Sequence, residues 1–323
     1  MSSKTAYFHL PGLFEFYELY KVFLPIFREH REYFYDWCDI GSIYGSPMDC
    51  IWSGGRVEVG EAETWKVLNL MQEYGISARL TFSNSLLKEE HLSDKICNDI
   101  CSLFAQNKSE KTNQTRINIQ NTSMESCGTQ NQKIINSYVS NGVIVHSDLL
   151  LNYPELYFVS STTKVITDFQ EFLKELNRED FRYVVPDFRL NKEFDKLKTL
   201  SEKQKDKVEF LCNECCWFGC KDRKVCYEAV SHKNLGEDFE HHCKAPNSSS
   251  GYQFSKAMKN PGFISVDDIK NVYLPMEFTN FKIEGRGLGS ALILEFLLYY
   301  MTRPEYQIHV REKIYLDSML DLF

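Results

Sequence analysis

The sequence of 323 residues lacks any run of eighteen apolar residues, and its start does not combine basic residues with a continuous apolar segment. These two absences argue against a membrane-spanning helix and against a secretory signal. The formal net charge is -8, which argues against general nucleic-acid binding, because such binding depends on neutralising phosphates with a basic face. We therefore expect a cytoplasmic, globular protein that has no membrane partner and no general nucleic-acid-binding surface.

Linkers rich in glycine and proline are also absent, so the whole chain, 1–323, is expected to form a single domain. Short apolar or β-branched runs alternate with longer segments of helical periodicity. The eight runs are 7–10, 39–44, 78–82, 143–146, 156–159, 183–185, 208–212 and 281–283. Strand and helix repeated about eight times predict an α/β fold, a (β/α)8 barrel of the TIM type. An open, doubly wound sheet is the alternative that this periodicity leaves open.

One segment, 107–132, interrupts the alternation. It is polar and of low complexity, so we expect a surface insertion or loop between a helix and the fourth strand. Its short run 116–119 could be a strand, which would change the expected number of strands by one.

Polar residues follow most of the predicted strands, and in a parallel barrel the chemistry lies at the carboxyl ends of the strands. The candidate catalytic residues are Asp187, Glu214, Glu284 and Arg286, and the candidate substrate-binding residues are Asn84, Ser161 and Asn213. Arg286 follows Glu284 closely and is its expected partner, either in substrate binding or in an ion pair that only closes the barrel. For strand-end Asp, Asn, Ser and Thr residues, and for Asn84, Asp148 and Thr162 in particular, capping of the next helix is the simpler interpretation.

The chain has eleven cysteines, and six of them fall within 211–243. In a reducing compartment all eleven would remain thiols. We expect 211–246 to be a metal-binding segment whose ligands are Cys216, Cys220, Cys226 and Cys243. Four thiolates suit zinc or an iron-sulfur cluster and exclude magnesium and calcium. In a zinc site His232, His241 or His242 could replace one thiolate, and the cysteines outside the segment are expected to be isolated.

Several known metal and catalytic motifs are missing. The sequence has no doubled CxxC of a zinc ribbon, no CxxxCxxC, and no HExxH helix of a zinc protease. No Ser-His-Asp or Cys-His arrangement can be assigned from spacing. The spacing of the thiols therefore does not choose between zinc and an iron-sulfur cluster.

Three motifs carry a resemblance to a known family. They are FKIEGR at 281–286 with a predicted helix behind it, NECC at 213–216 with Cys220, Arg223 and Tyr227 after it, and SSTTKV at 160–165. The chain resembles the collagenase-like peptidase family, which also includes RNA hydroxylation proteins and oxygen-independent ubiquinone hydroxylation proteins. The resemblance implies a TIM-type barrel and a 4Fe-4S cluster on four cysteines. Cys226 stands where the most similar branch has histidine, so Cys216, Cys220 and Cys243 are the firmer ligands.

Three hypotheses for function follow. The first is an iron-sulfur oxidoreductase that modifies a small molecule, RNA or a peptide by an oxygen-independent, hydroxylation-type reaction. The second is a peptidase-like hydrolase with a structural zinc. The third is a non-catalytic carrier or subunit, which would bind a protein partner through the apolar helix at 291–300.

Overall fold

A computed structural model describes residues 4–48, 50–54, 62–107, 109–110, 138–246, 248, 251–285 and 287–317. Eight parallel strands form one sheet in the order β8-β7-β6-β3-β2-β1-β10-β9. They are β1 (Ala6–Pro11), β2 (Cys38–Gly45), β3 (Ser77–Phe82), β6 (Gly142–Val145), β7 (Tyr157–Ser160), β8 (Phe181–Val184), β9 (Glu209–Leu211) and β10 (Asn280–Lys282). All eight predicted runs are strands of this sheet.

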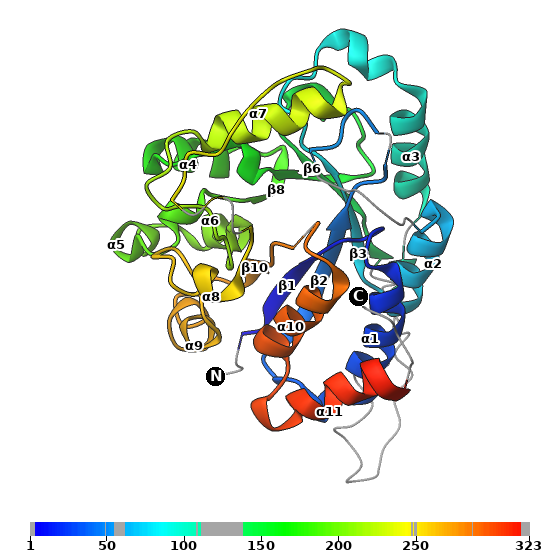
Figure 1. The fold of residues 1–323 in the computed structure, drawn as a ribbon, viewed down its shortest axis with the longest axis vertical. Coiled ribbons are helices and arrows are strands. Elements are labelled where there is room, and N and C mark those ends of the chain that lie inside the picture. Colours follow the sequence, from blue (N-terminus) through cyan, green and yellow to red (C-terminus); the bar gives the residue numbers. More distant parts are fainter. Residues whose placement is uncertain are drawn as a thin grey trace, which may run out of the picture.

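The sheet curls into a nearly closed barrel with helices between its strands (Figure 1). The gap between β8 and β9 is spanned by an isolated parallel bridge between Val184 and Val208. The predicted (β/α)8 barrel of the TIM type is therefore confirmed. The described part of the chain contains no helix that is long and apolar enough to cross a membrane.

The longer helices α1, α2, α3 and α4 each bury an apolar face against the outside of the strands. In α1, for example, Leu19, Tyr20, Phe23, Leu24 and Phe27 are buried, a spacing of one or three to four residues that places them on one side. The helices are α1 (Tyr17–Glu29), α2 (Thr64–Tyr74), α3 (Lys95–Gln106), α4 (Phe169–Leu176), α5 (Phe194–Leu197), α6 (Glu202–Lys207), α7 (Arg223–Asn234), α8 (Phe254–Ala257), α9 (Val266–Asp268), α10 (Ser290–Met301) and α11 (Gln307–Glu312).

Helix α10 is almost wholly buried. Seven of its residues, including Ile293, Phe296 and Tyr300, belong to the core. The apolar surface expected at 291–300 for a protein partner is therefore used for packing within the barrel. The hypothesis of a non-catalytic carrier or subunit therefore loses the exposed apolar helix on which it was based.

The predicted insertion 107–132 lies mostly outside the described residues, as does its run 116–119. Its start is described, because Ser109–Glu110 (β4) pairs antiparallel with Tyr138–Val139 (β5). These two short strands form a small sheet of their own.

The interior of the barrel has an apolar layer towards the carboxyl ends of the strands. Tyr44, Ile144, Val159, Val185 and Leu211 form this cluster, which is separate from the larger core between strands and helices. Side chains two residues apart on a strand share a face. The residues two positions before and after this layer therefore also tend to face the interior.

Near the amino ends of the strands the interior is charged. Arg79 Nη1 lies 2.5 Å from Glu209 Oε2, and Lys282 Nζ lies 3.5 Å from Glu209 Oε1. Arg79 Nε donates to the hydroxyl of Tyr157 at 2.7 Å. Arg79, Glu209 and Lys282 are buried, so each charge depends on its partners for the stabilisation that water would otherwise give.

The charges of this layer shift the pKa values of two members. Burial raises the pKa of Glu209, but Arg79, His9 and Lys282 outweigh it and hold this pKa at about 2. Burial, helped by the charges of Arg79 and Lys282, lowers the pKa of His9 to about 3. His9 is therefore neutral at pH 7, and its 3.5 Å contact with Glu209 is not an ion pair.

We predict that Glu209→Gln destabilises the protein at pH 7 by about 3 to 5 kcal/mol, because Arg79 and Lys282 lose their buried counter-charge. The pKa of Glu209 is lowered on folding, so its stabilisation is complete above pH 4.5 and is lost as the pH falls from 4.5 towards 2. The measurement is the unfolding temperature of both proteins between pH 7.5 and pH 3. The variant should unfold at a lower temperature than the unmodified protein at neutral pH, and this difference should become smaller below pH 4.5.

The control is Glu155→Gln, which changes the same charge at an exposed position. It should leave the unfolding temperature nearly unchanged at every pH. Equal effects of the two substitutions would contradict a stabilising role for the buried carboxylate.

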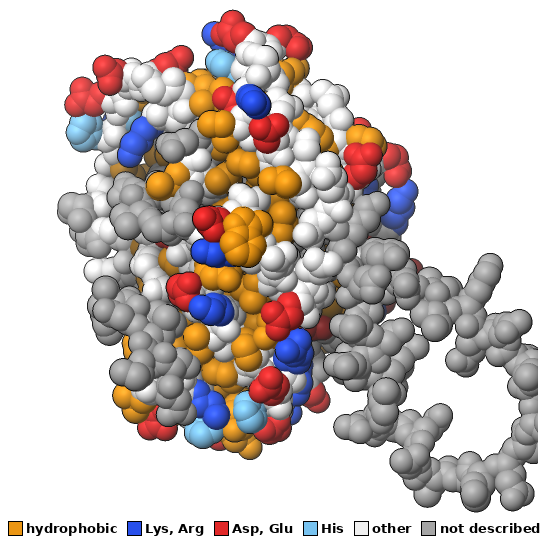
Figure 2. Space-filling view, turned by 90° about the vertical axis from the view of Figure 1, so that its right-hand side faces the viewer, with side chains coloured by type: hydrophobic (Ala, Val, Ile, Leu, Met, Phe, Trp, Pro, Cys, Tyr) orange, Lys and Arg blue, Asp and Glu red, His pale blue; other side chains and the backbone are white. Residues whose placement is uncertain are grey.

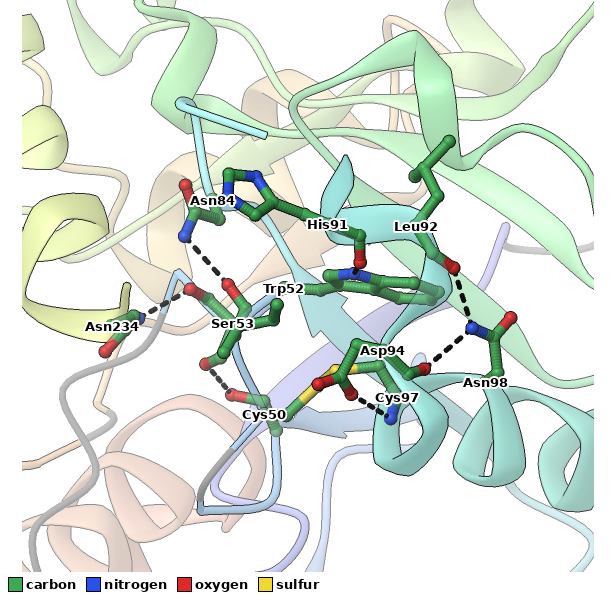
Figure 3. The surroundings of a disulfide bond; sticks show 12 residues. Cys50, Trp52, Ser53, Asn84, His91, Leu92, Asp94, Cys97, Asn98 and Asn234 are labelled. Carbon is green, nitrogen blue, oxygen red and sulfur yellow. Dashed lines mark hydrogen bonds between the residues drawn. A yellow bond between two sulfur atoms is a disulfide. The ribbon is translucent and has the colours of Figure 1, made fainter. Parts of the chain in front are cut away.

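The expectation that Cys50 and Cys97 are isolated thiols is wrong, because the two form a disulfide (Figure 3). Cys50 lies in the loop after β2 and Cys97 in the first turn of α3. The loop folds against this helix, which brings together Cα atoms 47 residues apart in sequence to 5.7 Å. The cysteines Cys38 and Cys101 are free and buried.

Candidate functional site

Polar residues gather at the carboxyl end of the barrel. Each of them follows a member of the apolar interior layer by two positions and therefore lies on the same face of its strand. These residues are Ser46, His146, Ser161, Asp187 and Asn213. Ser83 and Glu284 follow β3 and β10 in the same way. This end of the barrel is the place where barrel enzymes carry their chemistry.

Helix α7 lies across one side of this mouth (Figure 1). Its first residue, Arg223, pairs with side chains that follow β8 and β9. Towards its other end, Ser231 Oγ accepts from the amide of Ser85 after β3, at 3.0 Å, and Asn234 Nδ2 donates to the carbonyl of Ser53 after β2, at 2.5 Å. The helix therefore runs from the β8–β9 side to the β2–β3 side.

The guanidinium group of Arg223 is the centre of a buried ion cluster. Its Nη2 lies 2.5 Å from Glu214 Oε2 and donates to the Tyr227 hydroxyl at 2.7 Å. Its Nε lies 3.3 Å from Asp187 Oδ2. A second arginine, Arg189, contacts the other oxygen of Asp187 at 2.9 Å. Two carboxylates and two guanidinium groups thus neutralise one another at the mouth.

Glu214 and Glu284 form a carboxyl pair. Burial raises the pKa of Glu214, but the charge of Arg223 and hydrogen bonds from Arg223, the Cys216 amide and Glu284 outweigh it, so this pKa lies below its ordinary value. A hydrogen bond between two carboxyl groups requires one of them to carry a proton. Two neighbouring carboxyl groups of this kind are the side chains that acid-base chemistry commonly uses.

Asn213 sets the relative position of the two carboxyl groups. Its Oδ1 accepts from the Glu284 amide at 2.7 Å and its Nδ2 donates to the Glu284 carbonyl at 3.0 Å. The same Nδ2 lies 3.1 Å from the hydroxyl of Tyr252. The amide of Asn213, predicted to bind substrate, thus joins the ends of β9 and β10.

The two other predicted substrate-binding residues are also engaged within the protein. Asn84 Nδ2 donates to the carbonyl of Ile51 at 2.8 Å, and Asn84 Oδ1 accepts from the amide of Leu86 at 2.9 Å. Ser161 Oγ accepts from the amide of Thr163 at 3.2 Å. These are the capping and loop-fixing contacts of the simpler interpretation. The fourth predicted catalytic residue, Arg286, lies outside the described residues.

His146 is a mouth residue for which sequence analysis assigned no role. Its Nδ1 lies 2.9 Å from Thr163 Oγ1. Burial, with the charges of Lys164 and Lys224, lowers the pKa of His146 to about 4, so its imidazole is neutral at pH 7. The signal that could have identified it is its place two residues after Ile144, a position that faces the interior.

A small pocket beside the first turn of α7 brings most of the predicted metal ligands together. Its lining includes Cys220, Cys226 and Cys243, together with His241 and Trp217. Cys226 Sγ lies 3.0 Å from His241 Nε2. Three thiols and an imidazole form a soft donor set of the kind that zinc and iron-sulfur clusters bind.

Cys216 lies outside the lining of this pocket, close to Arg223 and Glu214. Its amide donates to Glu214 Oε1 at 2.8 Å, and burial raises the pKa of its thiol to about 12. Within the part of the chain that the structure describes, no three His, Cys, Asp or Glu side chains lie close enough together to hold a metal ion. The thiols and the imidazole are donors that suit zinc or an iron-sulfur cluster, but the sulfur atoms do not surround one common point in this structure.

The pocket and the ion cluster share a structural link in Arg189. Its Nε donates to the carbonyl of Phe218 at 2.8 Å and its Nη2 to the carbonyl of Cys220 at 2.5 Å. Since the same guanidinium group pairs with Asp187, the loop that carries the thiols is fixed to the end of β8. The thiol pocket and the carboxyl pair therefore form one composite site.

No protein-family model matches the sequence, and no curated protein matches it either. Among solved structures, that of the U32 peptidase Mk0906 is similar over 89% of this chain and 95% of that chain, with 12% sequence identity and a TM-score of 0.47. A likeness at this level carries no information on activity.

We predict that Arg223→Gln lowers the free energy of unfolding by about 3 to 5 kcal/mol, because it leaves Glu214 and Asp187 buried with a weakened set of partners. Urea denaturation at pH 7 measures the change. Lys224→Gln is the matched control, because it removes the same charge from the next residue of α7, which is exposed. It should cost about 0.5 kcal/mol or less, and similar losses in both variants would contradict the proposed importance of the ion cluster.

Proposed function

We propose that the protein is an iron-sulfur enzyme that carries out an oxygen-independent, hydroxylation-type modification of a small molecule, RNA or a peptide at the mouth of its barrel. The observation that carries the proposal is that Cys220, Cys226 and Cys243 line one pocket. This pocket adjoins the Glu214–Glu284 carboxyl pair through Arg189 and Arg223.

The fourth ligand in this proposal is Cys216. The charges of Arg223 and Cys220 both act on the pKa of its thiol, so the Cys216 thiol lies near these two residues. An all-thiolate set suits a 4Fe-4S cluster. Cys243 is exposed and lies in a stretch without helix or strand, so little packing opposes the adjustment that would bring its sulfur to the others.

The cluster would transfer electrons between the substrate and an oxygen donor, or activate that donor, and the donor would be reduced as the substrate is oxidised. The carboxyl pair of Glu214 and Glu284 would hold and move the proton that accompanies the change in the substrate. Arg223 fixes the orientation of Glu214, because its Nη2 contacts Oε2 while the Cys216 amide contacts Oε1. Helix α7 would limit the access of water from the side of the mouth that it covers.

A second candidate is a peptidase-like hydrolase with structural zinc, and one contact favours it. Cys226 Sγ and His241 Nε2 lie 3.0 Å apart, and the pocket lining offers Cys220, Cys226, Cys243 and His241 as a Cys3His set. A zinc ion with four protein ligands is structural. Glu214 or Asp187 would then act as the general base.

We predict that protein purified without oxygen contains about four iron and four sulfide per chain. Cys216→Ala and Cys220→Ala, singly or together, should lose the iron and its visible absorption, whereas His241→Ala should retain both. Cys38→Ala is the control, because this buried thiol lies at the amino end of β2, at the other end of the barrel. It should leave the metal content unchanged.

The same preparations distinguish the second candidate. Stoichiometric zinc that is lost in His241→Ala and kept in Cys216→Ala would replace the cluster by the Cys3His site. A chain that takes up neither iron nor zinc would overturn both assignments of the thiol pocket.

A further inference from the structure

The Cys50–Cys97 disulfide lies beneath a loop that also reaches the mouth of the barrel (Figure 3). Both cysteines are buried. The amide of Cys97 donates to the capping carboxylate of Asp94 at 2.8 Å, and the indole nitrogen of Trp52 donates to the carbonyl of His91 at 2.8 Å. The loop is thus attached to α3 and the turn before it by one covalent bond and one hydrogen bond.

The same loop offers its carbonyl groups to two residues of the mouth. Ile51 O accepts from Asn84 Nδ2 at 2.8 Å and Trp52 O from the amide of Asn84 at 3.1 Å. Ser53 O accepts from Asn234 Nδ2 at 2.5 Å. Figure 3 shows Asn84 and Asn234 reaching this loop from the side opposite the disulfide. The loop therefore helps to hold the end of α7, together with the contacts of Ser231 with Ser85.

Helix α7 is fixed mainly at its two ends. Its first residue, Arg223, pairs with Glu214 and Asp187, and its last residue, Asn234, is held by Ser53. Between the ends, most residues from Lys224 to Val230 are only half-buried. If either end of α7 is released, few core contacts of the helix therefore oppose its movement.

The sulfur chemistry of the chain favours a reversible bond. Eight other described cysteines are free thiols. In a reducing compartment, one disulfide among the described cysteines beside eight thiols is typical of a redox-responsive pair rather than of a disulfide framework. The disulfide joins α3 to the loop 50–54, whose Ser53 contacts the end of α7. Breaking it therefore loosens the loop that helps to hold this helix.

We propose that Cys50 and Cys97 form a redox latch that controls how firmly α7 is held over the mouth. In the oxidised form the disulfide fixes the loop, and Ser53 holds the end of α7. In the reduced form the loop keeps only its hydrogen bonds, and the end of α7 opens more often. The proposal rests on the disulfide and on the contact between Ser53 and Asn234. It does not depend on which metal the thiol pocket binds.

The reduction uses a dithiol, such as a thioredoxin-type protein in the cell. One thiolate of the dithiol attacks a sulfur of the disulfide and forms a mixed disulfide with one cysteine, while the other cysteine leaves as thiolate and takes up a proton. The second thiol of the dithiol then displaces the remaining cysteine. Two electrons and two protons pass from the dithiol, which ends as a disulfide, to Cys50 and Cys97.

Hydrogen exchange measured by mass spectrometry on the full chain tests the latch, with dithiothreitol as the reductant. We expect exchange in 226–234 and 50–54 to be about tenfold faster after reduction, because the covalent restraint is removed. Peptides from α4 and α10 should exchange at the same rate in both states. Equal rates in 226–234 before and after reduction would overturn the proposal.

Two variants serve as controls. The Cys50→Ser, Cys97→Ser double variant should exchange fast in 226–234 without reductant and should not respond to it. Any response to dithiothreitol that this variant shows in 211–225 or 235–246 belongs to the thiol pocket, so failure of the latch and failure of the metal proposal are distinguishable. Cys101→Ser removes a buried thiol one turn further along α3 and should keep the full response.

Alkylation of the unfolded but unreduced protein gives an independent measurement. Cys50 and Cys97 should be protected in protein treated with oxidised glutathione and modified after reduction, even if the double variant fails to fold. Modification of both cysteines after the oxidising treatment would overturn the latch.

Discussion

Two carboxylates, Asp187 and Glu214, are buried at the mouth of the barrel, and both face the guanidinium group of Arg223. A buried carboxylate without a partner costs several kcal/mol, so the end of β8, the end of β9 and the start of α7 are stable only together. Arg189 extends the same constraint to the loop that carries Cys220. The thiol pocket, the carboxyl pair and the helix above them therefore keep their relative positions through one ion cluster.

The barrel interior separates this cluster from a second one. Arg79, Glu209 and Lys282 pair near the amino ends of the strands, and the apolar layer around Val159 and Leu211 lies between the two groups. Charges interact over longer distances where no water screens them. The apolar layer increases the distance between the two charged groups. The group around Glu209 can therefore contribute stability, while the group around Arg223, at the open end of the barrel, remains available for chemistry.

The strands and part of the site could be predicted because both follow from local rules. Alternating apolar runs mark strands, and the ends of parallel strands meet at one edge, so Asp187, Glu214 and Glu284 had to lie at the same end of the barrel. Their common partner, Arg223, comes from a helix that returns across the mouth, and no periodicity encodes that return. Asn84 and Ser161 were identified as strand-end residues, but whether a side chain faces a ligand or its own loop depends on neighbours distant in sequence. The disulfide was missed for the same reason, since it depends on how one loop packs against α3.

Helix α7 connects the features that the sequence left separate. Cys226, on its first turn, faces the thiol pocket, and Asn234, at its end, contacts the loop held by the disulfide. A helix of twelve residues is about 18 Å long and moves largely as a rigid rod. A displacement of one end therefore changes the contacts of the other unless the helix unwinds. Because most of its middle residues are only half-buried, the contacts at its ends decide its position, and the state of the disulfide and the geometry of the thiol pocket are coupled through the same element.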